Sequence, residues 1–308
     1  MRTIRQESLG GPDVLELVEA SRPTPIPTEV LVRAVAAGVN PVDWKTRARG
    51  GFLGEPPFTV GWDVAGVVEE VGFGVTTLSV GDRVFGMPRF PHEAAAYAEY
   101  VTSPSRQLAR IPDGLSDVEA GALPLAGLTA WQALVETADV RPGQRVLVLA
   151  AAGGVGHLAV QIAKARGTHV LGTARAAKHP FLAELGVDEA IDYTSEDVAE
   201  RAREVDVVLD AVGGDAASDA LPAVRDGGIV ITLSGASVGS LRELAGDRIR
   251  IDGILVEPDR AGLEALAELA AAGALRPHVS HTFPLAEAAR AHELGETGRT
   301  QGKLVLTV

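Results

Sequence analysis

The chain has no cysteine among its 308 residues. Disulfide bonds, thiolate nucleophiles, iron–sulfur clusters and cysteine-ligated zinc are therefore all excluded. Basic residues are also few, because 28 Lys and Arg stand against 41 Asp and Glu and leave a formal net charge of −13. Nucleic acids and anionic membranes both select basic surfaces, so neither is expected as a partner. One local basic pocket for an anionic cofactor stays compatible with this charge.

Long apolar segments are missing as well. The N-terminal sequence MRTIRQESLGGPDVLELVEA lacks the apolar core of a signal peptide. The longest apolar run, residues 146–162, contains three glycines, His157 and Gln161, and is a poor membrane span. The composition, 46% hydrophobic and 22% charged, is ordinary for a soluble globular protein. These features predict a cytoplasmic protein.

The length favours two domains over one. Residues 1–118 are expected to begin a mostly β domain, because their valine-rich runs are broken by glycines at the intervals typical of a small curled sheet or barrel. Ser116 and Glu119 form a capping box that predicts the start of a helix. Residues 263–308 end in a strand, GKLVLTV, and are expected to return to this first domain.

Residues 119–262 are expected to form an α/β domain. Apolar strand-like runs alternate with helical patterns there, which predicts βαβ units and a doubly wound parallel sheet of the Rossmann type, covered on both faces. The expected strands are residues 146–149, 169–173, 190–193, 205–211, 229–233 and 249–256, and the expected helices are residues 155–166, 178–185 and 195–204.

The turn after the first of these strands is rich in glycine. It reads AAAGGVG, and the dinucleotide fingerprint G-x-G-x-x-G falls on Ala151, Gly153 and Gly156, with Gly154 in addition. Such a turn lets the backbone approach a pyrophosphate at a helix N-terminus. A tight strand–helix turn without a ligand is the alternative. Since the turn opens a βαβ series, we expect it to bind a dinucleotide.

The end of the second strand predicts which dinucleotide is bound. An NAD site usually has Asp or Glu about 20 residues after the glycines, on the ribose 2′-hydroxyl. This sequence has VLGTARAAKHP there, with Arg175 and Lys178 and no acidic residue. Cationic donors suit a 2′-phosphate, so NADPH is the expected cofactor. The alternative is that both cations lie on a solvated helix start.

The order of these motifs resembles a known family. The segments AGVNPVDWK, LPLAGLTAWQAL, PGQRVLVLAAAGGVG, LDAVGG and GKLVL resemble the medium-chain dehydrogenase/reductase superfamily, in its zinc-independent quinone oxidoreductase branch. The resemblance covers essentially the whole chain. It implies a GroES-like catalytic domain beside the Rossmann domain, and a homodimer for which residues 249–256 are the expected pairing edge.

Zinc-dependent members of that superfamily carry a cysteine after an early strand and a His-Glu pair after a glycine. Here the first position falls at residues 38–40, and Trp62 and Asp63 stand in place of the pair. The resemblance therefore implies no metal, and His278 and His281 are expected to have surface or packing roles. Tyr97 and Tyr100 are expected to be structural, so no proton donor is assigned.

The resemblance also implies roles for single residues. Asn40 and Asp43 are the catalytic candidates on the substrate side, with loop capping as the alternative for Asp43. The implied pocket walls are Trp44, Arg47, Phe52 and Trp62, with plain packing as the alternative for the aromatics. The implied cofactor-binding residues are Thr129, Ala152, Gly153, Gly154, Val155, Arg175, Lys178, Tyr193, Val212, Gly213, Leu233, Ser234, Gly302 and Lys303.

The chemistry that these residues predict is hydride transfer from NADPH to a small molecule. Quinones and α,β-unsaturated carbonyl compounds suit a site without a metal, because the anion formed is resonance-stabilised and a few hydrogen-bond donors can hold its oxygen. Two other functions stay open at this point. One is an NADPH-binding sensor or interaction protein with little turnover, and the other is a lyase or cyclase on the same fold.

Overall fold

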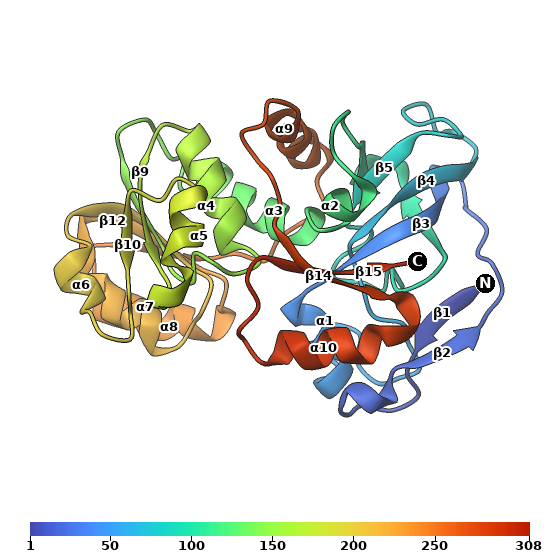
Figure 1. Cartoon of the computed structure of the whole chain (residues 1–308), viewed down its shortest axis with the longest axis horizontal. Helices are drawn as coiled ribbons and strands as arrows, with labels where there is room; N and C mark the ends of the chain where they lie inside the picture. Colours follow the sequence, from blue (N-terminus) through green and yellow to red (C-terminus); the bar gives the residue numbers. More distant parts are fainter. The chain divides into compact units, whose positions relative to one another are not determined.

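The fold is that of a computed structural model that describes residues 1–308. It divides into a first unit, residues 1–128 with 257–308, and a second unit, residues 129–256 (Figure 1). The sequence had placed the divisions at 118/119 and 262/263. The first division thus lies ten residues later than the sequence predicts, within α3 (Pro124–Trp131), and the second lies six residues earlier.

The first unit is built on a sheet of seven strands in the order β14-β15-β3-β4-β5-β7, with β6 also paired to β3. All pairs are antiparallel except β14 with β15. A separate hairpin pairs β1 (Arg2–Arg5) with β2 (Glu16–Glu19). The strands of the sheet are β3 (Glu29–Val39), β4 (Val64–Val71), β5 (Arg83–Gly86), β6 (Tyr100–Pro104), β7 (Leu108–Arg110), β14 (Val279–Pro284) and β15 (Lys303–Thr307).

Glycine-interrupted strands curl this sheet as the sequence predicts. A Cβ at Gly66 would come within 2.1 Å of the Arg33 carbonyl oxygen on β3, so the two strands approach there more closely than any side chain allows. The capping box is confirmed, because the Glu119 N–H donates to Ser116 Oγ at the start of α2. The helices of this unit are α1 (Pro41–Arg49), α2 (Asp117–Gly121), α9 (Arg260–Ala271) and α10 (Ala288–Glu296).

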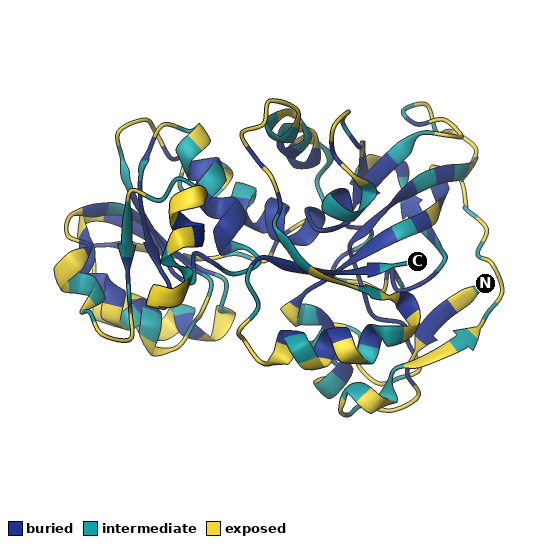
Figure 2. Ribbon diagram, in the orientation of Figure 1, coloured by how far each residue is buried: buried dark blue, intermediate teal, exposed yellow.

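The second unit contains a parallel sheet of six strands in the order β10-β9-β8-β11-β12-β13. The central strands β8, β9 and β11 and the second half of β12 are almost wholly buried, whereas the edge strands β10 and β13 are partly exposed (Figure 2), as expected for a parallel sheet with helices on both faces. The strands are β8 (Arg145–Val148), β9 (His169–Thr173), β10 (Glu189–Ile191), β11 (Val205–Asp210), β12 (Val224–Thr232) and β13 (Arg250–Gly253), and the helices are α4 (Gly156–Ala165), α5 (His179–Glu184), α6 (Val198–Arg201), α7 (Asp215–Ala220) and α8 (Val238–Ala245).

Three details of the second unit differ from the sequence prediction. The helix expected over residues 195–204 is only the single turn α6. His157, which the helical pattern places on the polar face of α4, is fully buried. Strand β12 begins five residues early, at Val224.

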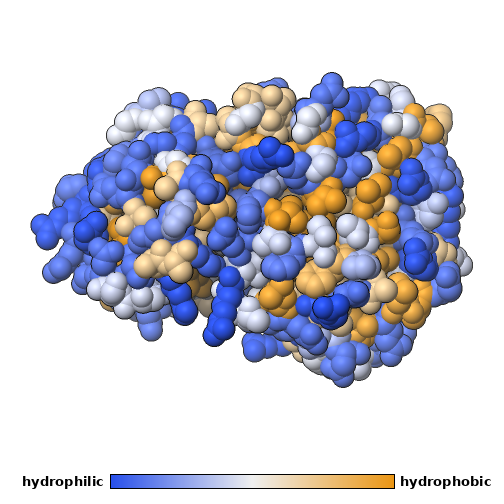
Figure 3. Space-filling model, in the orientation of Figure 1, coloured by the Kyte–Doolittle hydropathy of each residue, from blue (hydrophilic) through white to orange (hydrophobic).

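The surface in Figure 3 is mostly hydrophilic over the second unit, and apolar residues are more frequent over the first. β13 forms one edge of the six-stranded sheet, and the dimer expected there stays a prediction. No helix has the length and apolar character that spanning a membrane requires.

Candidate functional site

The glycine turn of the second unit follows β8 directly. Ala150 adopts a left-handed conformation with φ 53°, and the Gly153 N–H closes the turn on the Ala150 carbonyl at 2.9 Å. A Cβ at Gly156 would lie 2.3 Å from the Ala150 oxygen. Gly156 is therefore required for close packing of α4 on the strand, which is the role that the third glycine of the fingerprint predicts.

The backbone of this turn fits a pyrophosphate. The N–H groups of Gly154 and Val155 donate to no other residue, and they precede the N-terminus of α4, where unpaired donors and the helix dipole favour an anion. Gly153 leaves the approach open, since a Cβ there would meet only the Ala150 oxygen, at 3.2 Å. Ala152, next to it, is buried. These residues could hold a dinucleotide.

A buried histidine of α4 holds the backbone of the glycine turn in place. His157 Nδ1 lies 2.9 Å from the Gly153 carbonyl oxygen, and the His157 ring is wholly buried. Thr173, at the end of β9, holds the other side, because its Oγ1 accepts from the Ala150 N–H at 3.0 Å. Sequence reasoning missed both residues. For His157 a signal was available, because a side chain four residues after Gly153 can reach the Gly153 carbonyl.

Two cations follow β9. Arg175 is exposed, and its Nε donates to the Tyr193 hydroxyl at 3.3 Å. Burial lowers the pKa of Lys178, and the charge of Arg175 lowers it further. The structure thus brings Arg175, Lys178 and Tyr193 together, and a bound anion would relieve the repulsion between the two cations.

The loops after β11 and β12 are tied to each other by Asp210. Its buried carboxylate accepts from the Val212 and Gly213 N–H groups at 2.9 and 2.8 Å and from the Thr232 hydroxyl at 2.7 Å. Thr232 Oγ1 in turn accepts from the Ser234 N–H at 3.0 Å. Four predicted positions, Val212, Gly213, Leu233 and Ser234, are therefore held by a residue that sequence reasoning did not select. Thr129, the remaining predicted position of this unit, is a buried residue of α3.

A polar cluster in the first unit joins Asn40, Asp63 and Lys303. The Asn40 amide donates to Asp63 Oδ2 at 2.8 Å, and its carbonyl oxygen accepts from Lys303 Nζ. Lys303 Nζ also donates to the Val39 carbonyl at 2.9 Å and lies 3.7 Å from Asp63 Oδ2. The Asn40 amide is therefore fixed in one orientation. Its second N–H has no partner in the chain.

This cluster changes the interpretation of Lys303. The residue is only 3% exposed, and its ammonium donates two hydrogen bonds and faces the Asp63 carboxylate inside the first unit. A cofactor-binding role for Lys303 stays a prediction that this burial does not support. Gly302, beside it, has φ 63°, and a Cβ there would lie 2.2 Å from the His278 carbonyl oxygen, so it serves the close approach of β14 and β15.

The same cluster does not fit a zinc ion. The oxygen of Asn40 and the Oδ2 atom of Asp63 already face the Lys303 ammonium, and the Trp62 indole donates to the His92 carbonyl at 2.7 Å. No group of three or more His, Asp or Glu side chains in the 308 residues is arranged to hold a metal. No step of the chemistry below is routed through zinc.

Asp43 belongs to a second buried chain of hydrogen bonds. Its Oδ2 accepts from the Asn40 N–H at 2.6 Å and from the Tyr97 hydroxyl at 3.1 Å, and Tyr97 lies 3.1 Å from His292 Nε2. Burial raises the pKa of Asp43 to about 7 and lowers that of His292 to about 3. The other oxygen of Asp43, Oδ1, is buried without a partner. Asp43 therefore caps α1 through Oδ2, and its Oδ1 atom forms no hydrogen bond within the chain.

The predicted pocket walls are mostly packed inside the first unit. Arg47 is 2% exposed and pairs with Glu296 at 2.7 Å, and Trp44 packs on Gly295, where a Cβ would lie 2.6 Å from its ring. Trp62 is fully buried, whereas Phe52 is 50% exposed. That Trp44, Arg47 and Trp62 line a substrate pocket stays a prediction that their packing does not support. Of the four predicted residues, only Phe52 is free enough of such packing to contact a substrate.

Comparisons with known proteins give one consistent answer. A family model described as alcohol dehydrogenase GroES-like domain matches residues 26–113, and one described as zinc-binding dehydrogenase matches residues 185–306. The chain is 36% identical to a 2-haloacrylate reductase of Burkholderia sp, covering 96% of each. It superposes on the quinone oxidoreductase from Coxiella burnetii with a TM-score of 0.94 at 38% identity, covering 100% of this chain and 99% of the other. For the Escherichia coli quinone oxidoreductase complexed with NADPH the TM-score is 0.89 at 30% identity, covering 100% of both.

Proposed function

The chain belongs to the medium-chain dehydrogenase/reductase superfamily, in its zinc-independent quinone oxidoreductase branch, and from this premise we propose that it transfers hydride from NADPH to a quinone or an α,β-unsaturated carbonyl compound. It is an oxidoreductase that uses a nicotinamide cofactor. The choice of NADPH and the class of acceptor are the two parts of the proposal.

The observation that supports NADPH is the cation pair after β9. Arg175 and Lys178 lie close enough for the charge of one to lower the pKa of the other, and the Tyr193 hydroxyl lies beside them. No acidic residue follows β9 in the sequence before α5, where it would bind a ribose 2′-hydroxyl and repel a 2′-phosphate; the Asp192 carboxylate, which reaches the Ala176 N–H from the segment after β10, is the one acidic group beside the pair. Arg175→Ala and Lys178→Ala should therefore raise the KM for NADPH and leave the KM for NADH nearly unchanged.

The acceptor class follows from the donors that the first unit offers. When bound, the reduced nicotinamide supplies a hydride. The second N–H of the Asn40 amide, fixed by Asp63 and Lys303, is the donor that we assign to the acceptor's carbonyl oxygen, where negative charge develops. A quinone and an enone both place such an oxygen in conjugation with the carbon that receives the hydride. A simple ketone does not, because the hydride goes to its carbonyl carbon and leaves a localised alkoxide, which is best stabilised by a Lewis acid that the Asn40–Asp63–Lys303 cluster cannot bind.

Deuterium transfer tests the reaction. The protein is incubated with an enone and NADPH that carries deuterium at the transferable C4 position, and the product is analysed by mass spectrometry. The proposal predicts deuterium on the β-carbon of the enone product. Reduction of the enone without deuterium on its β-carbon would contradict the proposal. Faster transfer of the label to a simple ketone than to the enone would contradict it as well.

A further inference from the structure

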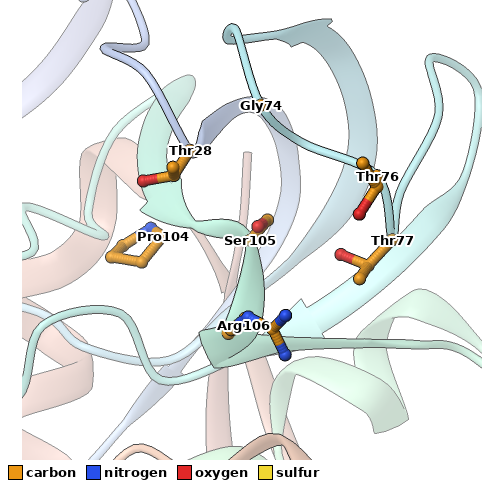
Figure 4. Close-up of a pocket in the computed structure, with 7 residues that line it drawn as sticks. All are labelled: Thr28, Gly74, Thr76, Thr77, Pro104, Ser105 and Arg106. Atoms are coloured by element: carbon orange, nitrogen blue, oxygen red, sulfur yellow. The ribbon is translucent and has the colours of Figure 1, made fainter.

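A small hollow lies on the first unit, and none of the residues that line it is assigned a role above. Its volume is about 130 Å³, and three loops surround it: the turn before β3, the connection from β4 to β5, and the short helix η2 (Ser105–Gln107) after β6 (Figure 4). The residues that line it are Thr28, Gly74, Thr76, Thr77, Pro104, Ser105 and Arg106.

Backbone hydrogen bonds hold the three loops together. The Ser105 N–H donates to the Thr28 carbonyl at 3.0 Å, and the Thr28 N–H donates to the Phe73 carbonyl at 2.8 Å. Glu29 and Pro104 face each other in the register of β3 and β6. The walls are therefore fixed before any ligand arrives, which lowers the entropic cost of binding.

The polar side chains of the hollow have no partners in the chain. Arg106 is exposed and forms no ion pair or hydrogen bond, and the Ser105 hydroxyl forms none although the residue is only 7% exposed. Thr77 Oγ1 also lacks a partner, but this oxygen is shielded from solvent and is not counted among the ligand donors. In Figure 4 the hydroxyls of Thr76 and Thr77 and the Arg106 guanidinium are directed into the space between Ser105 and Thr77, whereas the Thr28 hydroxyl turns away. No carboxylate lines the hollow.

These groups select an anion of a definite size. A guanidinium has only donors, and hydroxyls can donate to an acceptor that brings several oxygens. The hollow has room for one tetrahedral oxyanion, because its volume of about 130 Å³ is several times the roughly 10–15 Å³ that a single water needs on the same measure. We propose that this hollow binds a single phosphate group, either as inorganic phosphate or as the terminal group of a phosphate monoester.

The residues that line the hollow are not among those of the proposed cofactor site. They all lie in the first unit, whereas the glycine turn and the cation pair lie in the second. The net charge of −13 repels an anion, and Arg106 attracts it. Salt screens both effects, so the affinity should fall with rising ionic strength if the attraction to Arg106 is the larger of the two.

Amide shifts in a ¹⁵N-labelled, deuterated sample test the proposal. Inorganic phosphate and, separately, glycerol 3-phosphate are titrated at constant ionic strength, with and without saturating NADP⁺. The proposal predicts saturable shifts at Thr76, Thr77, Ser105 and Arg106 that fit one Kd and do not depend on NADP⁺. Binding of inorganic phosphate alone supports a site for the free anion, and binding of both probes supports one that accepts monoesters.

Variants separate this site from general charge effects. Arg106→Ala and Ser105→Ala should each weaken binding, by roughly ten-fold or more for Arg106→Ala. Arg49→Ala, at an exposed arginine of α1 that also lacks an ion pair, should leave the Kd unchanged. Shifts that do not saturate, or an equal Kd in wild type and Arg106→Ala, would overturn the proposal, and neither result bears on reductase activity.

Discussion

Replacement of Lys303 by methionine tests whether this residue is part of the core of the first unit. The change removes the ammonium and keeps most of the side-chain volume. Asp63, which is fully buried, loses the charge 3.7 Å away and keeps its hydrogen bonds from the Asn40 amide and the Leu125 N–H, at 2.8 and 2.7 Å. The variant therefore leaves a buried carboxylate without a counter-charge.

The expected loss can be worked from this geometry. Two unit charges 3.7 Å apart attract by about 4 kcal/mol at an effective dielectric constant of ~20. Removing one member of a buried pair costs about 3–5 kcal/mol for the same reason. We expect the free energy of unfolding of the first unit to fall by roughly this amount at pH 7, measured by urea denaturation of the cofactor-free protein in a Trp131→Phe background, so that the fluorescence of Trp44 and Trp62 is the signal.

The pH dependence gives the loss a signature. Burial already raises the pKa of Asp63, and Lys303 opposes that rise, so the pKa of Asp63 should rise further in Lys303→Met. A protonated Asp63 needs no counter-charge, and the difference from wild type should therefore shrink as the pH falls through that raised pKa. Adding Asp63→Asn should recover most of the loss. A Lys303→Met protein as stable as wild type, or a loss that is the same at pH 5 and pH 8, would refute this reasoning.

Three further predictions follow from single contacts. Gly156→Ala should destabilise the second unit by about 1–3 kcal/mol and weaken NADPH binding in a fluorescence titration, because the added Cβ would lie 2.3 Å from the Ala150 oxygen. The control Gly239→Ala, whose Cβ would have no atom within 4 Å, should change neither stability nor binding. Asp43→Asn should flatten the dependence of stability on pH between pH 4 and 7. Burial raises the pKa of Asp43 from 3.8 to about 7, so the stability that its protonated form contributes is fully present below pH 3.8 and is lost as the pH rises through 7. A variant whose stability in thermal melts changes with pH as steeply as that of the wild type would count against the assignment. Arg47→Met should cost about 1–3 kcal/mol of stability in urea denaturation without changing the KM for any acceptor, since its guanidinium pairs with Glu296; an effect on KM alone would restore Arg47 to the substrate pocket.

Local patterns predicted the parts of the fold that local forces determine. The strand over residues 169–173 is observed with the same bounds as β9, and β8 and β11 agree to within one residue at each end, because a buried parallel strand is a continuous apolar run. The glycine turn was predictable for a similar reason. The packing of Gly156 on Ala150 depends only on residues six positions apart.

Contacts between distant residues were not predictable in this way. Lys303 lies 263 positions from Asn40, and nothing in the QGKL segment shows that its lysine is buried. Arg47 reads as an ordinary charged residue of a short helix, yet Glu296 and His292 on α10 enclose it. His157 occupies a polar position in the helical pattern and is buried because the Gly153 carbonyl provides a partner. In each case a polar side chain is buried where a partner is supplied by another part of the fold.

The central claim is that this chain reduces a conjugated carbonyl acceptor with NADPH, and the loss of NADPH absorbance at 340 nm tests it most directly. The assay compares a quinone, an enone and an enoyl thioester with a simple ketone, using NADPH and NADH in parallel and Lys178→Ala beside the wild type. We expect turnover with at least one conjugated acceptor, a preference for NADPH, and a selective loss of that preference in the variant. NADPH that binds without being consumed by any acceptor, or a protein that does not bind NADPH at all, would contradict the account.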